Sequence, residues 1–249
     1  MDLVPMHGWE LTPTQAVELQ RELRGRVVLR VPEGLRVERV AGLDISMSRG
    51  EDWAAGGLVV LDAQTREPVA QASAVTPLRF PYVPGLLSFR ELPVLSEVWR
   101  RLEVRPDLLI FDGQGIAHPR RLGIASHGGL LFGVPSIGCA KSLLVGRHGP
   151  LGEERGARAD ILHQGEVVGQ AVRTRRGVQP VYVSPGHLMD LPTAVEWVLR
   201  MTSRYREPET TRHAHRLVNE VRRAHVSREE SPGGGRPGFT DGVRPARPC

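Results

Sequence analysis

Three acidic residues lie where strands and a helix are expected to meet, and their carboxylates could together hold a divalent cation. Asp44 falls within the apolar segment VAGLDIS, Asp112 ends the apolar segment LLIFD, and Glu91 lies near the start of a helix that begins around SFRELP. A carboxylate among apolar strand residues is costly to bury unless it is paired, hydrogen-bonded or bound to a cation. Taken singly, a buried strand aspartate is more often a hydrogen-bonded structural residue than a ligand. Three close carboxylates, however, repel one another until a divalent cation neutralises them.

The ligand types and the net charge indicate what such a cation would do. Hard oxygen ligands without a cluster of histidine and cysteine favour Mg²⁺ or Mn²⁺ over zinc. The chain carries 33 basic and 28 acidic side chains, a net charge of +5 and a pI near 10.0, which favours a polyanionic partner. A basic protein that presents carboxylates to Mg²⁺ indicates phosphate chemistry. In that chemistry the cation activates a water, holds the scissile phosphate and stabilises the leaving oxygen.

The segments that must position these residues begin with a helix and three strands. Periodic apolar residues predict an amphipathic helix over 12–29, with Thr12 as N-cap and Pro13 at the first position. Segments 36–46, 57–62 and 68–75 are alternating or apolar and are typical of strands. Because their connections are short, we expect an antiparallel meander that carries Asp44 on its first strand.

The rest of the chain alternates helices and strands. A helix over 88–102 follows the proline-rich loop PLRFPYVPG, and a buried strand over 107–112 precedes the glycine-rich DGQGIAHPRRLGIASHGG. Further expected elements are a helix ending at Phe132, a strand over 135–139, a hairpin over 161–172, a strand over 181–184, and helices over 191–204 and 207–223. This order predicts an α/β fold with a central mixed sheet flanked by helices, its first three strands antiparallel and its later strands parallel.

The organisation of the chain indicates one folded domain over 1–226 and a tail over 227–249. Prolines and glycines make up 9 of the 19 residues over 231–249, so this Pro/Gly/Arg-rich tail is expected to be disordered. No apolar stretch approaches the roughly 18 residues that span a bilayer, and residues 1–10 show no secretory signal. The two cysteines, Cys139 and Cys249, cannot form a disulfide framework. These features predict a cytoplasmic protein without membrane association.

Six segments, taken in order, resemble those of the endonuclease V family of DNA repair nucleases. They are AGLDIS, PYVPG, FRE, DGQGIAHPRRLGIASHGG, AKS and AHRLVNE, and the resemblance extends over about residues 10–224. It implies an RNase H-like fold, which agrees with the expected meander. The implied activity is hydrolysis at the second phosphodiester bond 3′ to a deoxyinosine, leaving 3′-hydroxyl and 5′-phosphate ends. Mg²⁺ is the implied cofactor, with Mn²⁺ as a substitute, and single- or double-stranded DNA containing deoxyinosine is the implied substrate of a monomer.

The resemblance assigns catalytic roles to five residues. Asp44 and Asp112 correspond to the family's metal-binding carboxylates, and Glu91 completes the acidic site directly or through water. His215, in the last predicted helix, corresponds to a histidine placed near the attacking water. Lys141, the only lysine in the chain, corresponds to the active-site lysine, whose point charge suits a phosphate oxygen or a developing oxyanion.

Some of these residues have plain structural alternatives. Without the resemblance, His215 is an exposed helix histidine beside His213, and Lys141 is a solvated surface lysine. Asp107, five residues before Asp112, matches another acidic position of the family but is equally suited to capping or packing at the start of its strand.

The resemblance also implies a pocket for the altered base and a wedge beside it. Deamination of adenine gives hypoxanthine, which pairs poorly and can be extruded into a close-fitting pocket at low cost. Tyr82, in a loop restrained by Pro81 and Pro84, would stack where the base was removed, the alternative being a packed turn. The implied pocket residues are Gly85, Leu87, Gly113 and Ile124, with His118 touching base or phosphate.

Two further functions stay open beside cleavage of deoxyinosine DNA. Inosine-containing RNA is an alternative substrate, because nothing in the sequence excludes a 2′-hydroxyl. A non-catalytic nucleic-acid-binding domain is the other, although a binding module has no need of a carboxylate cluster facing an anion. Six arginines are candidates for phosphate contacts: Arg120, Arg121, Arg147, Arg173, Arg175 and Arg176.

Overall fold

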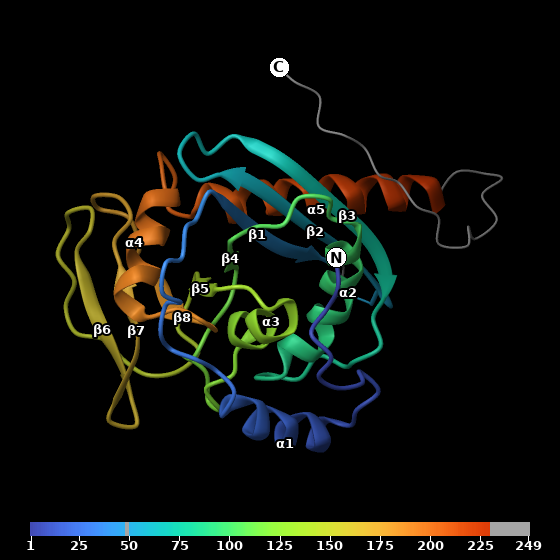
Figure 1. The fold of residues 1–249 in the computed structure, drawn as a ribbon, viewed down its shortest axis with the longest axis horizontal. Coiled ribbons are helices and arrows are strands. Elements are labelled where there is room, and N and C mark those ends of the chain that lie inside the picture. The colour runs from blue at the N-terminus through green and yellow to red at the C-terminus, as the bar shows by residue number, and fades with distance from the viewer. Residues whose placement is uncertain (48–49, 230–249) are drawn as a thin grey trace.

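One eight-stranded mixed sheet forms the centre of the protein, whose computed structural model describes residues 1–47 and 50–229 (Figure 1). The strand order is β3-β2-β1-β4-β5-β8-β7-β6. The strands are β1 (Arg39–Ser46), β2 (Trp53–Asp62), β3 (Pro68–Pro77), β4 (Leu108–Phe111), β5 (Ser136–Ala140), β6 (Arg158–His163), β7 (Glu166–Val172) and β8 (Val181–Pro185). β1, β2 and β3 form the predicted antiparallel meander, and β4 pairs in parallel with both β1 and β5.

The last three strands, β6, β7 and β8, are all antiparallel to their neighbours. β8 pairs antiparallel with β5, β7 with β8 and β6 with β7. The prediction that later strands are parallel is therefore right for β4 and β5 and wrong for β8, whereas the hairpin predicted over 161–172 is confirmed by the antiparallel pair of β6 and β7. Parallel neighbours need a crossover of about a dozen or more residues, usually a helix. β6 and β7 are instead joined by Gln164 and Gly165, both with positive φ, and only residues 173–180 separate β7 from β8. Connections this short impose antiparallel pairing.

Helices cover both faces of the sheet (Figure 1). They are α1 (Pro13–Arg24), α2 (Leu87–Arg101), α3 (Ile124–Phe132), α4 (Leu191–Met201) and α5 (Glu209–Glu229). α2 and α3 bury their apolar sides on one face, and α4 and α5 pack on the other. α1 lies below α3 in Figure 1, where Leu23 packs against Leu122 and Leu130. The sheet is thus enclosed in a three-layer arrangement that leaves its strand ends available for a site.

Side-chain alternation along β1 decides where its acidic residue points. Ala41 and Leu43 join the core beneath α2 and α3, so the residue between them faces α5. That residue is Gly42, where an added Cβ would lie 2.1 Å from the carbonyl oxygen of Thr210. Only glycine allows the start of α5 to approach the strand this closely. Two residues further on, Asp44 projects to the same α5 side.

β4 repeats this alternation one strand away. Ile110 belongs to the core beneath α4 and α5, whereas Phe111 belongs to the core on the opposite face. The next residue, Asp112, therefore follows on the α5 side. Phe111 pairs with Leu43 in the parallel register, so Asp44 and Asp112 are the next neighbours across the two strands. The two aspartates meet at the carboxyl ends of adjacent parallel strands.

The element ends follow local capping signals. α1 begins as predicted, with Thr12 as N-cap in a capping box with Gln15, but it ends at Arg24, well before residue 29, and Gly25 follows it. α5 continues through Glu229, so residues 227–229 of the predicted tail are helical. The remainder of that tail lies outside the described residues. Across residues 1–47 and 50–229, none of the helices is long and apolar enough to cross a membrane.

Candidate active site

Two hydrogen bonds orient the carboxylate of Asp44. Its Oδ2 lies 2.8 Å from Nδ1 of His215, and its Oδ1 accepts from the backbone N–H of Ile45 at 2.8 Å. Burial raises the pKa of the Asp44 carboxyl and the charge of Asp112 adds to the rise, while the two hydrogen bonds oppose it. α5 thus brings His215 to the first of the two aspartates.

His215 keeps one ring nitrogen available. Its side chain is 60% exposed, against 14% for Asp44. An ionised carboxylate only accepts hydrogen bonds, so Nδ1 of a neutral His215 carries the proton and the lone pair on Nε2 remains available. Asn219, one turn along α5, donates to the His215 carbonyl oxygen at 2.9 Å and accepts from the hydroxyl of Ser46 at 3.0 Å. This second link between α5 and β1 holds the ring in an orientation suited to a general base.

Lys141 lies between two carboxylates. Its Nζ is 2.6 Å from Oδ2 of Asp112 and 3.2 Å from Oε2 of Glu207. Partial burial by itself would lower the pKa of Lys141, but the hydrogen bonds and charges of these two partners outweigh it and raise the pKa. Lys141 is therefore a fixed cation beside the second aspartate. Sequence reasoning missed Glu207, because the segment REPET carries no local signal of a site.

Glu91, near the start of α2, approaches the aspartates from the other face of the sheet. Burial, followed by the charges of Asp44 and Asp112, raises the pKa of the Glu91 carboxyl to about 8. Carboxylates that raise one another's pKa form a donor set that a divalent cation stabilises. Within the described residues, no three histidine, cysteine or acidic side chains converge closely enough to hold a metal by themselves. Asp44, Asp112 and Glu91 nevertheless offer the hard oxygen donors that suit a hydrated divalent cation, with Glu91 reaching it directly or through water.

A pocket of about 360 Å³ opens beside Asp112, between the loop over residues 81–85, here called the wedge loop, and the start of α3. This volume falls within the roughly 300–1,000 Å³ of small-molecule sites. Asp112 and Lys141 line the pocket, as do Tyr82 and Pro84, whereas Pro81 lies outside its lining. All of the base-pocket residues expected from the sequence also line it: Gly85, Leu87, Gly113, His118 and Ile124.

The wedge loop is clamped through the carbonyl oxygen of Gly85. This oxygen accepts from Nε2 of Gln20 at 3.0 Å, Nε2 of His118 at 3.0 Å and Nη2 of Arg120 at 2.7 Å. Gly85 has a φ of +79°, a conformation that favours glycine. The other ring nitrogen of His118 accepts from the backbone N–H of Arg120 at 3.2 Å. Because the protein engages both of its ring nitrogens, His118 holds the loop while its ring lines the pocket.

Tyr82 projects from the clamped loop. Its side chain is 71% exposed, whereas the neighbouring Phe80 is 4% exposed and packs against Phe89. Arg90 donates to the Phe80 carbonyl oxygen at 2.5 Å, which fixes the base of the loop. The packed-turn alternative therefore describes Phe80, and the tyrosine ring is left free to contact another molecule.

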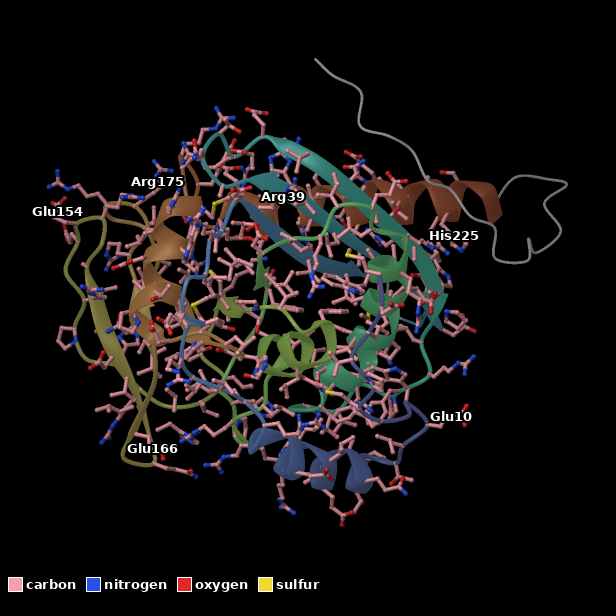
Figure 2. All side chains as sticks on the ribbon, in the orientation of Figure 1. Glu10, Arg39, Glu154, Glu166, Arg175 and His225 are labelled. Carbon is pink, nitrogen blue, oxygen red and sulfur yellow. The ribbon has the colours of Figure 1, made fainter. Side chains whose placement is uncertain are left out.

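Asp107 has a structural task at the opposite end of the sheet. Its Oδ2 accepts from the backbone N–H groups of Glu38 and Arg39, each at 2.9 Å. These bonds join the start of β4 to the start of β1, where Arg39 is labelled in Figure 2. Of the two roles left open by the sequence, capping is the one that the structure supports.

Besides Arg120 in the clamp of the wedge loop, two more of the six arginines expected to contact phosphate serve the fold. Arg121 is 7% exposed and donates to the carboxylate of Glu166 at 2.9 Å and to the carbonyl oxygen of His163 at 3.0 Å. It thereby anchors the β6–β7 hairpin, on which Glu166 is labelled in Figure 2. Arg173 donates to the carbonyl oxygen of Gly152 at 2.6 Å. The N–H groups of both guanidinium groups are thus partly occupied by bonds within the protein.

A groove of about 490 Å³ runs along α5 beside the carboxylate site. Its lining residues are Lys141, Glu207, Arg212, His215, Arg216, Asn219, Glu220 and Arg223. The three arginines lie on one stripe of the helix, because residues three, four or seven apart share a helix face. Arg212 pairs with Glu209 at 2.5 Å, and Arg216 and Arg223 are exposed. Sequence reasoning missed these arginines, although their spacing in the last helix was the signal that could have found them.

This fold and site together define a class of protein. A mixed sheet that begins with an antiparallel meander, with aspartates at adjacent strand ends faced by a lysine and a histidine, is that of a nuclease with an RNase H-like fold. The family model for endonuclease V matches residues 21–216, and the chain belongs to the endonuclease V family. It is therefore an endonuclease, and nucleases of this family depend on a metal.

Relatives and solved structures agree with this assignment. Endonuclease V of Myxococcus xanthus is 73% identical over 216 residues, which cover 87% of this chain and 92% of the relative. The crystal structure of endonuclease V from Streptomyces avermitilis matches with a TM-score of 0.84 at 43% identity, covering 88% of this chain and 96% of that one. Endonuclease V of Ciona intestinalis matches with a TM-score of 0.75 at 27% identity, covering 85% and 98%. That protein was solved in complex with a 24mer DNA containing an inosine followed by a ribo-adenosine.

Proposed function

We propose that this protein is a DNA repair endonuclease that recognises deoxyinosine and hydrolyses the second phosphodiester bond on its 3′ side, leaving 3′-hydroxyl and 5′-phosphate ends. The observation that carries the proposal is that Asp112 and Lys141 belong both to the carboxylate site and to the lining of the 360 Å³ pocket. A base held in that pocket keeps its own strand beside the hydrolytic residues. The inosine-containing DNA bound to the Ciona intestinalis relative supports this choice of base.

The shape of the pocket suits an extruded purine. Gly85 and Gly113 leave backbone accessible to a flat ring, and a Cβ on Gly113 would lie 2.6 Å from the side chain of Ile124. Hypoxanthine pairs poorly, so its extrusion costs less than that of an ordinary base. The exposed ring of Tyr82 lies at the edge of the pocket and can stack on the bases that remain in the duplex.

Mg²⁺ is the proposed cofactor, with Mn²⁺ as a substitute, and Asp44 and Asp112 would hold it, with Glu91 completing the site directly or through water. When bound, such a cation supplies an activated water and stabilises charge on the phosphate. His215, held through Nδ1 by Asp44, accepts the proton of the attacking water at Nε2. Lys141, held by Asp112, directs its charge to a phosphate oxygen.

The arginine groove on α5 supplies a path for the strand. It shares Lys141 and His215 with the carboxylate site, so a backbone that reaches the site continues along the groove. Exposed Arg216 and Arg223 can each neutralise a phosphate there. These contacts carry no sequence information, which suits an enzyme that must cut beside its lesion in any sequence.

Inosine-containing RNA is a second candidate substrate. The observation that favours it is the ribo-adenosine that directly follows the inosine in the DNA bound to the Ciona intestinalis relative. A non-catalytic binding domain is disfavoured, because the family is one of nucleases and the paired aspartates, the lysine and the histidine are all in place here.

The test uses end-labelled DNA with one deoxyinosine, incubated with Mg²⁺ or with a chelator, and maps the cut at nucleotide resolution. We expect one Mg²⁺-dependent cut at the second bond 3′ to deoxyinosine and no cut in the matched adenine strand. Asp112→Ala should abolish cleavage but keep lesion binding. Asp190→Asn, a conservative change at the N-cap of α4, is the matched control and should cut normally.

The outcomes separate the candidates. Cleavage at another bond, or cleavage by Asp112→Ala with Mg²⁺ present, overturns the proposal. Faster cutting of a matched RNA strand with one inosine selects the second candidate instead.

A further inference from the structure

A buried chain of hydrogen bonds leads from the N-terminal segment to the pocket. Oγ of Ser88 lies 3.0 Å from Nδ1 of His127, and Nε2 of His127 lies 2.9 Å from Nε2 of His7. Nδ1 of His7 lies 2.8 Å from the carbonyl oxygen of Gly8. Ser88 belongs to the first turn of α2 and lines the 360 Å³ pocket. None of these side chains has a role in the hydrolytic site described above.

Burial keeps the middle of this chain neutral. His127 is 0% exposed, and burial, followed by the nearby His7, lowers its pKa to about 3. Ser88 is 2% exposed and belongs to the lining of the pocket. A neutral imidazole has one N–H and one lone pair, so one of its ring nitrogens donates a hydrogen bond and the other accepts one. The donor at one end of the chain therefore fixes which atom donates in every other bond.

The order of donors and acceptors along the chain is set at its outer end, at His7. The carbonyl oxygen of Gly8 can only accept, so Nδ1 of a neutral His7 carries the proton and its Nε2 accepts. Nε2 of His127 must then donate to His7, which leaves Nδ1 of His127 as an acceptor. The hydroxyl of Ser88 donates to that nitrogen. Its proton therefore points away from the pocket, and the oxygen can only accept from whatever occupies the pocket.

We propose that Ser88 is a base-reading residue, a fixed hydrogen-bond acceptor that His127 and His7 hold in position. This inference rests on the proposed function, because it requires the altered base to enter the pocket. Hypoxanthine carries an N–H at position 1, next to its 6-carbonyl group, whereas adenine has an unprotonated nitrogen there. The fixed Ser88 oxygen can accept a hydrogen bond from the N–H of hypoxanthine, whereas in adenine it would face the unprotonated nitrogen, which is also an acceptor. Ser88 thereby helps to separate the deaminated base from its parent.

The experiment measures preference between bases. Strands of one sequence carry deoxyinosine, deoxyadenosine or unsubstituted purine deoxyribonucleoside at a single position. Equilibrium affinity and single-turnover cleavage at saturating enzyme are measured for each strand. In Ser88→Ala the affinity ratio of inosine to purine strands should fall about tenfold, the value of one hydrogen bond.

Two further variants guard against a purely structural effect. Ser96→Ala removes another buried hydroxyl of α2, which donates to the Leu92 carbonyl oxygen, and should keep the full wild-type ratio. His127 is enclosed, so the link is tested at its partly exposed end with His7→Ala. That variant should lower the ratio in the same direction as Ser88→Ala.

The results distinguish two failures. If the wild-type protein binds and cuts inosine and adenine strands equally, the proposed function fails and this inference fails with it. If the wild type prefers inosine and Ser88→Ala keeps that preference in full, only the assignment of Ser88 is overturned. An equal loss of affinity for all three strands also overturns it, because a structural role would weaken binding without changing the ratio.

Discussion

His215 Nδ1 and Asp44 Oδ2 lie 2.8 Å apart, although 171 residues separate them along the chain. The contact exists because α5 packs directly over β1, and it turns the free Nε2 of the imidazole outward. A base whose second nitrogen is held by a carboxylate is a recurring arrangement in hydrolytic sites. The same helix also carries the arginines of the groove, so one packing interface sets both parts of the site.

Removal of the His215 imidazole should slow hydrolysis but not binding. We expect His215→Ala to reduce the single-turnover rate by about 10²–10⁴-fold, the usual contribution of a positioned general base. Lesion affinity should change little, because the ring contributes no charge that binds phosphate when it is neutral. His213→Ala, two residues away, serves as control, and an equal loss in both variants would show that α5 had merely been disturbed.

The contact between α5 and β1 should depend on Gly42. An alanine Cβ there would meet the Thr210 carbonyl oxygen at 2.1 Å, so Gly42→Ala must displace the start of the helix. We expect a loss of roughly 1–3 kcal/mol in the free energy of unfolding, measured by urea titration, together with slower cleavage. Gly149→Ala, where nothing lies within 4 Å, is the matched control. Wild-type stability of Gly42→Ala would refute the tight packing.

The groove arginines should determine how binding responds to salt. Arg216→Ala and Arg223→Ala, each in the non-cleaving Asp112→Ala background, should weaken binding to strands of any sequence. Each should reduce the slope of log affinity against log salt by about 0.7–0.9, the value for one phosphate contact. Arg36→Ala, an exposed arginine before β1, should leave the slope unchanged. If the Arg216→Ala and Arg223→Ala variants show the same salt dependence as the Arg36→Ala control, the groove does not contact the phosphate backbone.

The aromatic ring of Tyr82 should contribute to lesion affinity by stacking. Tyr82→Ala is expected to lose roughly 1–3 kcal/mol of binding free energy, about 5- to 150-fold in affinity. Tyr82→Phe keeps the ring and should keep the affinity. Fluorescence anisotropy with lesion DNA measures both, and an unaltered affinity of Tyr82→Ala would rule out the wedge.

Acid should destabilise the protein through His118. Burial, followed by the charge of Arg120, lowers its pKa from 6.5 to about 4 in the folded chain. The unfolded state then binds more protons between these values, so the stabilisation is complete above about pH 6.5 and is lost as the pH falls toward 4. The slope is at most roughly 1.4 kcal/mol per pH unit. Denaturant titrations of His118→Gln, whose amide can still donate to Gly85, should show a shallower pH dependence, and identical slopes would contradict a buried neutral ring.

Much of the fold could be predicted because local patterns report local structure. Thr12 and Gln15 mark the start of α1 within a single helical turn. Alternating side chains mark β1 and β4 and place Asp44 and Asp112 at their ends. Pairing direction was predicted only in part: the hairpin of β6 and β7 was expected, but β8 was expected to be parallel and instead pairs antiparallel with both β5 and β7.

The sequence by itself determined the element types, the motif residues and the family resemblance, because periods of 2 and 3.6 and short motifs are read along the chain. Only the tertiary structure decided which side chains meet. It paired Lys141 with Glu207, linked Ser88 through His127 to the N-terminal segment, and buried Arg121 under the hairpin. Each of these contacts joins segments far apart in sequence. Their geometry depends on how the helices and the hairpin pack around the sheet, which no local pattern encodes.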